Sequence, residues 1–178
     1  MGLTSYGAPS HCLPWLEPVS STPRRIVSGA QTGADLAALD FAMARGIECG
    51  GWVPLGRRNE DGRIDGCYPN LIEVDRPEPA LRTRQNVRDS DGTLILSHGA
   101  LTGGSRLTAC IARELGRPLL HLDLSTMTYE EACAGLVRWM EADTVRVLNV
   151  AGPRHSRDPE IYERTIAVLE AAFATQSG

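Results

Sequence analysis

Short apolar runs alternate along the chain with longer segments whose apolar residues recur at helical spacing. Buried strands are predicted at 25–28, 93–97, 119–122 and 145–150, with shorter extended pieces at 52–53 and 71–74. Helices are predicted at 32–46, 80–89, 105–115, 128–142 and 158–173. This alternation predicts an α/β fold, a Rossmann-like three-layer sandwich with a mostly parallel sheet of about five strands.

Local signals mark the expected ends of several helices. Thr32–Asp35 fits a loose capping box, with Asp in place of Glu, and Gly46 is placed to end the same helix. Thr128–Glu131 fits the full capping box. Asp158 is the expected N-cap of the last helix, and Pro159 is its expected first residue.

Three of the predicted strands run directly into a glycine-containing turn that opens a helix. The turns are at 29–33, 101–105 and 151–153. Turns that follow the strands of a parallel sheet lie along one edge, so backbone amides and positive helix N-termini should meet in one crevice. This arrangement binds anions, and it predicts a ligand that is a phosphorylated small molecule.

Composition describes one globular domain with a short extension. The chain has 178 residues, of which 42% are hydrophobic and 22% are charged. Residues 1–23 hold four prolines and show no periodicity, so they are expected to form a flexible arm, with the domain at 24–176. The net charge of −4 lacks the basic excess typical of proteins that bind nucleic acid polymers.

Cysteine usage and hydropathy indicate a cytoplasmic location. The five cysteines are odd in number and form no C-x-x-C pair, so free thiols are expected in place of disulfides or a metal site. No apolar run approaches the roughly 20 residues that span a bilayer, and the N-terminus lacks the pattern of a secretory signal. Neither a membrane partner nor export is therefore predicted.

The first glycine turn supplies several candidate ligand-binding residues. Small residues at Gly29 and Gly33 allow backbone amides to approach an anion, and Gln31 and Thr32 add side-chain donors, although a simple tight turn would need the same glycines. Asp35 could hold a ribose hydroxyl or a metal ion, but such a residue more often satisfies the helix end. Neither the G-x-G-x-x-G motif nor a P-loop is present.

The other turns and an arginine cluster add further ligand-binding candidates. Paired glycines bring the backbone close to an anion, hydroxyl groups donate to it, and arginine offsets its charge. The alternative is a plain loop that leads into a helix. The candidates are Gly103, Gly104 and Ser105 in the second turn with Thr108 after it, Gly152 in the third turn with Asn149 before it and Arg154 after it, and Arg82 before the strand at 93–97.

The long polar loop after the second predicted strand has two interpretations. In the first, Arg57 and Arg58 hold phosphate oxygens and Trp52 stacks on a base. Glu60 and Asp61 are then candidate general bases or metal ligands. In the second, the loop is a solvated charged segment and Trp52 belongs to the core.

Six segments between residues 28 and 154 form a recognisable set, and the similarity extends over roughly residues 25–173. They are Ser28–Asp35 followed by Ala38–Asp40, Gly50–Arg58, Arg82–Thr83 with Asn86–Val87, Ser90–Ile95, Gly103–Ser105 and Asn149–Arg154. Together they resemble the circularly permuted YpsA-like family of the SLOG superfamily, labelled "putative molybdenum carrier". The same superfamily includes the "lonely guy" phosphoribohydrolases, which activate cytokinins, and the bacterial DNA-uptake protein A.

This resemblance implies a Rossmann-like domain that binds a nucleotide-type ligand at the strand C-termini, as a binding protein or sensor. It also implies a homodimer. The phosphoribohydrolase motif P-G-G-x-G-T-x-x-E, laid on Gly103 and Gly104, puts Arg106 at the third Gly, Leu107 at the Thr and Cys110 at the Glu. The phosphate-binding half of the motif is kept and its catalytic glutamate is absent.

Two alternatives to a nucleotide-binding protein therefore stay open. One is a hydrolase that cleaves the N-glycosidic bond of a nucleoside phosphate with Glu60 or Asp61 as its carboxylate. The other is a carrier of molybdate or of the molybdenum cofactor. Molybdate is a tetrahedral dianion like phosphate, and the cofactor carries a phosphate of its own, so amides at helix N-termini suit both.

Overall fold

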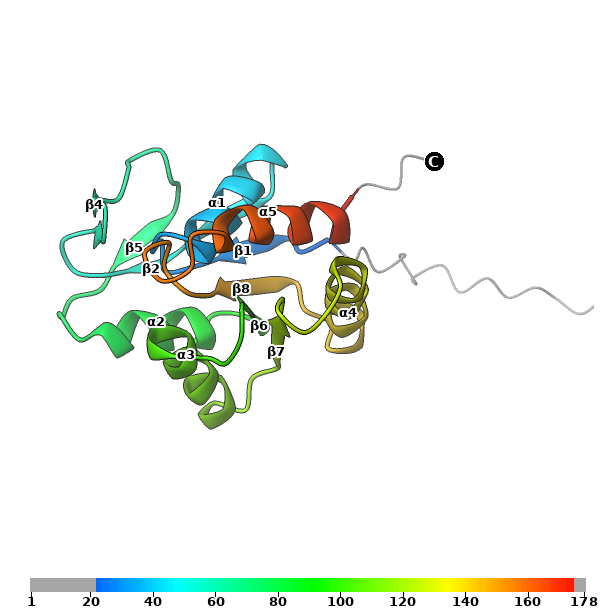
Figure 1. Cartoon of the computed structure of the whole chain (residues 1–178). Helices are drawn as coiled ribbons and strands as arrows, with labels where there is room; N and C mark the ends of the chain where they lie inside the picture. The colour runs from blue at the N-terminus through cyan, green and yellow to red at the C-terminus, as the bar shows by residue number, and fades with distance from the viewer. Residues whose placement is uncertain (1–21, 175–178) are drawn as a thin grey trace, which may run out of the picture.

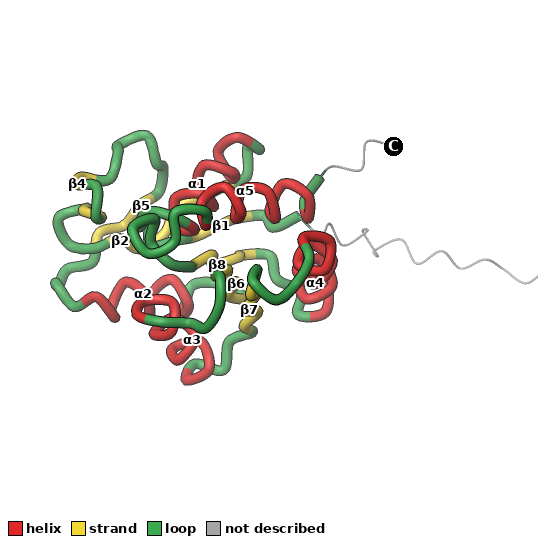
Figure 2. Tube along the Cα trace, in the orientation of Figure 1, coloured by secondary structure: helices red, strands yellow, loops and turns green. Residues whose placement is uncertain are grey.

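The computed structural model describes residues 22–174, in which helices cover both faces of a parallel sheet (Figures 1 and 2). The six strands lie in the order β5-β2-β1-β8-β6-β7, and every neighbouring pair is parallel. Their bounds are β1 Arg25–Val27, β2 Glu48–Val53, β5 Leu71–Glu73, β6 Gly92–Ser97, β7 Leu119–Asp123 and β8 Val147–Ala151. The predicted Rossmann-like α/β class is confirmed.

Five helices form the two outer layers. They are α1 Ala34–Ala44, α2 Pro79–Arg88, α3 Gly103–Glu114, α4 Tyr129–Ala142 and α5 Ile161–Ala172. Helices α1, α4 and α5 pack together over one face of the sheet, and α2 and α3 pack together over the other (Figure 1). No helix within residues 22–174 combines the length and the hydropathy needed to cross a bilayer.

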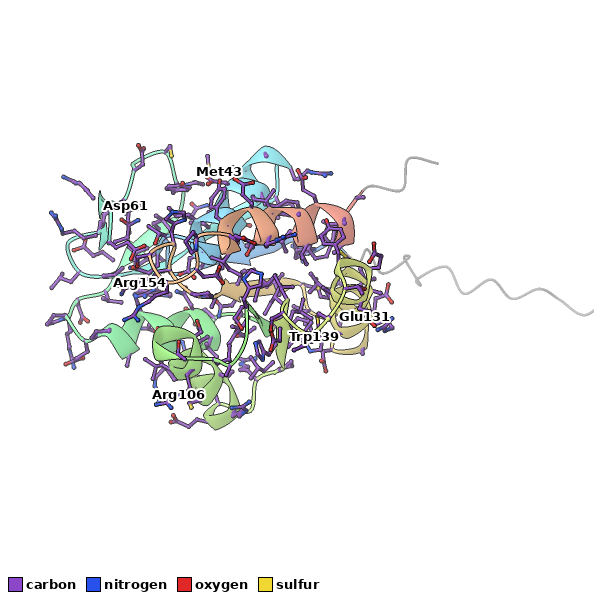
Figure 3. The ribbon with its side chains drawn as sticks, in the orientation of Figure 1. Met43, Asp61, Arg106, Glu131, Trp139 and Arg154 are labelled. Atoms are coloured by element: carbon purple, nitrogen blue, oxygen red, sulfur yellow. The ribbon has the colours of Figure 1, made fainter. Side chains whose placement is uncertain are left out.

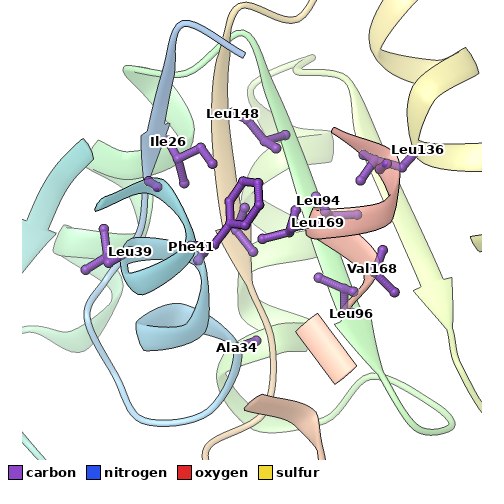
Figure 4. Close-up of a cluster of buried hydrophobic side chains, with 14 of the residues drawn as sticks. Ile26, Ala34, Leu39, Phe41, Leu94, Leu96, Leu136, Leu148, Val168 and Leu169 are labelled. Atoms are coloured by element: carbon purple, nitrogen blue, oxygen red, sulfur yellow. The ribbon is translucent and has the colours of Figure 1, made fainter. Parts of the chain in front are cut away.

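The main core lies between the sheet and the layer of α1, α4 and α5. Ile26, Leu94 and Leu148 project from the strands onto Phe41 and Leu169 of the helices, and all five are at most 2% exposed (Figure 4). Burying a side chain of this size stabilises the fold by about 1.5–3 kcal/mol. Packing between the apolar strands and these helices therefore fixes the position of the sheet edge at which the strands end.

The sheet has six strands where about five were predicted, and the difference lies around β2. This strand begins at Glu48, four residues before the predicted piece at 52–53, because Gly50 and Gly51 conceal its apolar pattern. It then pairs with β5, which adds an edge strand. The predicted loop at 54–69 also contains a small antiparallel hairpin, β3 (Arg58–Asn59) with β4 (Gly62–Arg63).

Two predicted helix starts are wrong. Helix α1 has Gly33 as its N-cap without a side-chain bond, because the Thr32 hydroxyl is engaged elsewhere, donating to Glu60. Helix α5 begins at Ile161, after the predicted Pro159, and the Asp158 carboxylate bonds the His98 ring. In both cases a long-range partner takes the side chain that the local pattern assigned to the cap.

The predicted capping box of α4 is confirmed. The Thr128 amide donates to Glu131 Oε2 over 2.8 Å, and the Glu131 amide donates to Thr128 Oγ1 over 3.2 Å. Free thiols are also confirmed for the four cysteines within the described chain, at positions 49, 67, 110 and 133. The predicted arm, apart from its last two residues, and Cys12 lie outside the described residues.

Candidate functional site

The three glycine-containing turns border one cavity of about 560 Å³. It opens at the carboxyl ends of β1, β6 and β8, and one side is closed by α2. Its lining comprises Gly29, Gln31, Asp35, Arg82, Thr83, Asn86, Thr102–Ser105, Thr108, Asn149–Arg154, Ser156 and Arg157. The expected convergence of the turns on one crevice is thus present in the structure.

Glycines allow the first and third turns to approach this closely. A Cβ at Gly33 would overlap the carbonyl oxygen of Pro153, and the φ of +76° at Gly33 is one that side chains rarely adopt. A Cβ at Gly152 would lie 2.5 Å from the Ala34 Cβ and 2.7 Å from the Leu96 carbonyl oxygen. The two turns therefore form one unit, packed at backbone distance.

The charge of the lining favours an anion. Arg82, Arg154 and Arg157 line the cavity, and Asp35 is the single acidic residue among the described lining residues. Arg82 is almost buried, with 16% of its side chain exposed, and its Nη1 donates to the Gly29 carbonyl oxygen over 3.3 Å. Burial, together with the nearby Arg154, lowers the pKa of Arg82, and the neighbouring Asp35 opposes this shift. The guanidinium stays charged because the ordinary pKa of arginine is far above neutral pH.

Asp35 is a buried carboxyl group in the cavity wall. Its Oδ2 accepts a hydrogen bond of 3.4 Å from the backbone N–H of Gln31 and lies 4.0 Å from Arg82 Nη1. Burial raises the pKa of Asp35 to about 6, against the opposing effects of Arg82 and of backbone N–H groups. Near neutral pH the group is mostly ionised, but by a small margin.

Two further pockets adjoin the cavity. One, of about 270 Å³, shares Gln31, Arg82 and Arg154 with it and continues toward the β3–β4 hairpin, so Arg154 lies between the hairpin and α2 (Figure 3). Its lining adds Pro54, Leu55, Arg58, Asn59, Glu60, Val74 and Arg76–Pro79. The other, of about 430 Å³, shares Thr102, Ser105, Pro153 and Arg157 with the cavity.

The structure brings most of the sequence-predicted residues to the cavity itself. Gly29, Gln31, Asp35, Arg82, Gly103, Gly104, Ser105, Thr108, Asn149, Gly152 and Arg154 all line it. Arg58 and Glu60 line the adjoining pocket beside the hairpin. Thr32 and Gly33 belong to the first turn, but they are buried behind the wall.

Three predicted residues lie away from the cavity. Trp52 Nε1 donates to Asp89 Oδ2 over 2.8 Å, which holds the indole against α2. Arg57 Nη1 donates to the Leu71 carbonyl oxygen over 3.1 Å and so braces its own loop. Asp61 is exposed in the hairpin (Figure 3) and lines none of the three pockets described above.

Glu60 joins the polar loop to the first and third turns. Its carboxylate accepts hydrogen bonds from the Thr32 hydroxyl, from the Ser156 amide over 3.1 Å and from the Ser156 hydroxyl over 2.5 Å. The hydrogen bonds from Ser156 and Thr32 lower the pKa of Glu60 to about 2. A carboxylate this acidic is a weak general base, and the geometry favours a structural role.

We expect Glu60→Gln to destabilise the protein by about 1 kcal/mol at neutral pH, a modest value because the carboxylate is exposed. The folded-state pKa is below the ordinary value of 4.5, so the stabilisation exists above that pH and is lost as pH falls toward 2. Urea denaturation of both proteins should show the difference shrinking over this range. Asp61→Asn is the control, and an equal effect there would contradict the proposed role of Glu60.

Sequence reasoning did not single out two residues of this region. His98 Nδ1 lies 2.8 Å from Asp158 Oδ2 in the second adjoining pocket, and its position directly after β6 was the available signal. Asn86 lines the cavity, and its amide pairs with the backbone of Trp52 through bonds of 2.7 and 2.9 Å. The pairing of Asn86 with Trp52 joins segments that are far apart in the sequence, so no local pattern could reveal it.

Comparison with known proteins gives two matches. The sequence model of the circularly permutated YpsA SLOG family matches residues 26–173. A crystal structure of a "putative molybdenum carrier protein" from Syntrophus aciditrophicus is 48% identical, covering 84% of this chain and 94% of that chain, with a TM-score of 0.82. No curated protein matches this chain.

Proposed function

The chain belongs to the circularly permutated YpsA SLOG family, and we propose that it is a ligand-binding protein whose cavity holds the phosphate of a nucleotide-type small molecule. The observation that carries this proposal is the meeting of three strand-to-helix turns with Arg82, Arg154 and Arg157 around one cavity. Amides and guanidinium groups of this kind suit a phosphate better than a neutral ligand.

The N-terminus of α3 supports the proposal most directly. Its N-cap, Thr102, makes no side-chain capping bond, so no cap competes with a ligand for the first-turn amides of this helix. Added Cβ atoms at Gly103 and Gly104 would meet nothing within 4 Å, which leaves the backbone open to a ligand. The dipole of a twelve-residue helix adds a partial positive charge at the same point.

A carrier of molybdate or of the molybdenum cofactor is the second candidate. The relative from Syntrophus aciditrophicus is named for this role, and the arginines together with the backbone amides at the N-terminus of α3 would bind molybdate or the terminal phosphate of the cofactor. The hydrolase alternative gains no such support. Glu60 is engaged by Ser156, and Asp61 lies outside the pockets described above.

Thermal denaturation with AMP, inorganic phosphate and molybdate tests the proposal. A ligand present at about 100 times its Kd adds about 2.7 kcal/mol of stability, so the melting temperature should rise by several degrees with AMP. A larger rise with molybdate than with AMP would favour the carrier. If none of the three raises the melting temperature, the anion cavity is not a binding site and the proposal is wrong.

Arg154→Ala should weaken AMP binding by about tenfold or more, since a hydrogen bond to a charged group contributes about 1.5–3 kcal/mol. Arg154 is exposed and lines both the cavity and the pocket beside the hairpin, so little folding stability should be lost. Calorimetric titration with AMP measures the effect. Arg164→Ala, on the exposed side of α5, is the control and should bind as the unmodified protein does.

A further inference from the structure

A buried side-chain oxygen that has no partner among the described residues lies in the wall between the cavity and the pocket beside the hairpin. Gln31 is 7% exposed and lines both spaces. Its Oε1 has no hydrogen-bond partner among the described residues. Because buried polar groups are ordinarily paired, the position calls for a partner that comes from outside the chain.

Asp35 adds hydrogen-bond acceptors to the same wall. An ionised carboxylate has about four acceptor positions. The backbone N–H of Gln31 donates to Oδ2 over 3.4 Å, and the backbone N–H groups of Gly29 and Gly152 also donate to the carboxylate. The carboxylate is 6% exposed and lines the cavity, so a ligand there is the natural source of a further donor. The loose ion pair with Arg82, at 4.0 Å, leaves room for that donor.

The charges around Asp35 are compatible with an anionic ligand. Arg82 faces it from α2, and Arg154 and Arg157 line the same cavity from the segment that follows the third turn. These three cations outnumber the one carboxylate, so a phosphate is still attracted. The carboxylate then acts on the part of the ligand that lies beside the phosphate.

We propose that Gln31 and Asp35 form a subsite for a hydroxyl group of the ligand, of the kind that the sugar of a nucleotide carries. The inference rests on the proposed function, because it assumes that a phosphate binds at the N-terminus of α3. The hydroxyl donates to the Asp35 carboxylate, and the side-chain amide of Gln31 pairs with the same sugar. The rest of the ligand can extend past Gln31 into the adjoining pocket, which Pro54, Leu55 and Val74 help to line.

This subsite would discriminate between a nucleotide and bare molybdate. Sulfate and molybdate carry no proton near neutral pH, so they would give the Asp35 carboxylate no further donor and would add repulsion between like charges. A sugar phosphate supplies the missing donor. Sites built around a hydrogen bond reject analogues that lack the bonding group far more strongly than apolar pockets reject a missing methylene.

Calorimetric titration of the full chain with AMP, 2′,3′-dideoxy-AMP and sulfate tests the inference. We expect AMP to bind at least about tenfold more tightly than the dideoxy analogue. In Asp35→Asn this ratio should fall toward one and sulfate should bind more tightly, because the charge is removed at nearly constant shape. Gln31→Leu should weaken AMP more than the dideoxy analogue. Asp61→Asn, outside the cavity, is the matched control.

The outcomes separate the two proposals. Equal binding of AMP and its dideoxy analogue, with no change in sulfate affinity in Asp35→Asn, overturns the hydroxyl subsite and leaves the anion cavity standing. Absence of binding by all three probes overturns the anion cavity as well. Should Asp35→Asn fail to fold, Gln31→Leu still decides the question, since loss of the same affinity from both nucleotides would contradict the subsite.

Discussion

Replacing Gly29 by alanine should weaken AMP binding by about 10- to 100-fold while the protein stays folded. A Cβ at Gly29 would overlap Arg82 Nη1 and would lie 2.9 Å from Asp35 Oδ2. Both are the mobile ends of side chains, and the φ of Gly29 is not one that requires glycine, so the backbone can accept alanine. The clash therefore moves the guanidinium away from the cavity and spares the core.

Calorimetric titration with AMP measures this loss, and thermal denaturation checks the fold. Gly66→Ala is the control, because a Cβ there meets nothing within 4 Å and no positive φ is involved. The double variant Gly29→Ala/Arg82→Ala should bind no more weakly than Arg82→Ala, since the two changes remove the same interaction. Additive losses would contradict the explanation through Arg82.

The second large effect is expected for Gly33→Ala, which should destabilise the protein by about 3–5 kcal/mol. The added Cβ would overlap the Pro153 carbonyl oxygen and would lie 2.9 Å from Ile161 Cγ2 and 3.0 Å from the His155 amide nitrogen. The clash is mainly with backbone, which cannot turn aside. A typical domain has only about 5–15 kcal/mol of stability, so much of the total would be lost.

Urea denaturation measures this loss, and Gly46→Ala separates its two causes. Gly46 also has a positive φ, +66°, but a Cβ there meets nothing within 4 Å. That variant should lose only the cost of the backbone conformation, about 1 kcal/mol. If the two variants lose equal stability, then the close packing of the first and third turns does not contribute to folding.

Much of the architecture could be predicted because parallel strands buried on both faces are apolar throughout. Leu94–Leu96 and Val147–Val150 show this pattern plainly, and Thr128–Glu131 is a local device whose two partners lie three residues apart. Strand β2 was largely missed because Gly50 and Gly51 interrupt its apolar pattern. Glycine is needed at these two positions because a Cβ would overlap Asn70 at Gly50 and Ser28 at Gly51, and no local pattern encodes these contacts.

The candidate site could likewise be predicted only in part. Glycine turns after strands could be recognised, and parallel topology brings all such turns to one edge of the sheet. Individual side chains in the polar loop could not be placed, because charged residues there have several partners within reach. Trp52 pairs with Asp89, and Glu60 pairs with Ser156, across 37 and 96 residues of chain respectively.

From the amino-acid order alone come the alternation of elements, the three turns at strand ends and the family resemblance, since all three depend on periodicity or on short motifs. Only the tertiary structure places Arg82 against Gly29, leaves Gln31 Oε1 without a partner among the described residues and engages the Glu60 carboxylate with Ser156. These outcomes depend on burial and on distances between residues far apart in sequence, which set the charge state and hydrogen bonding of each group.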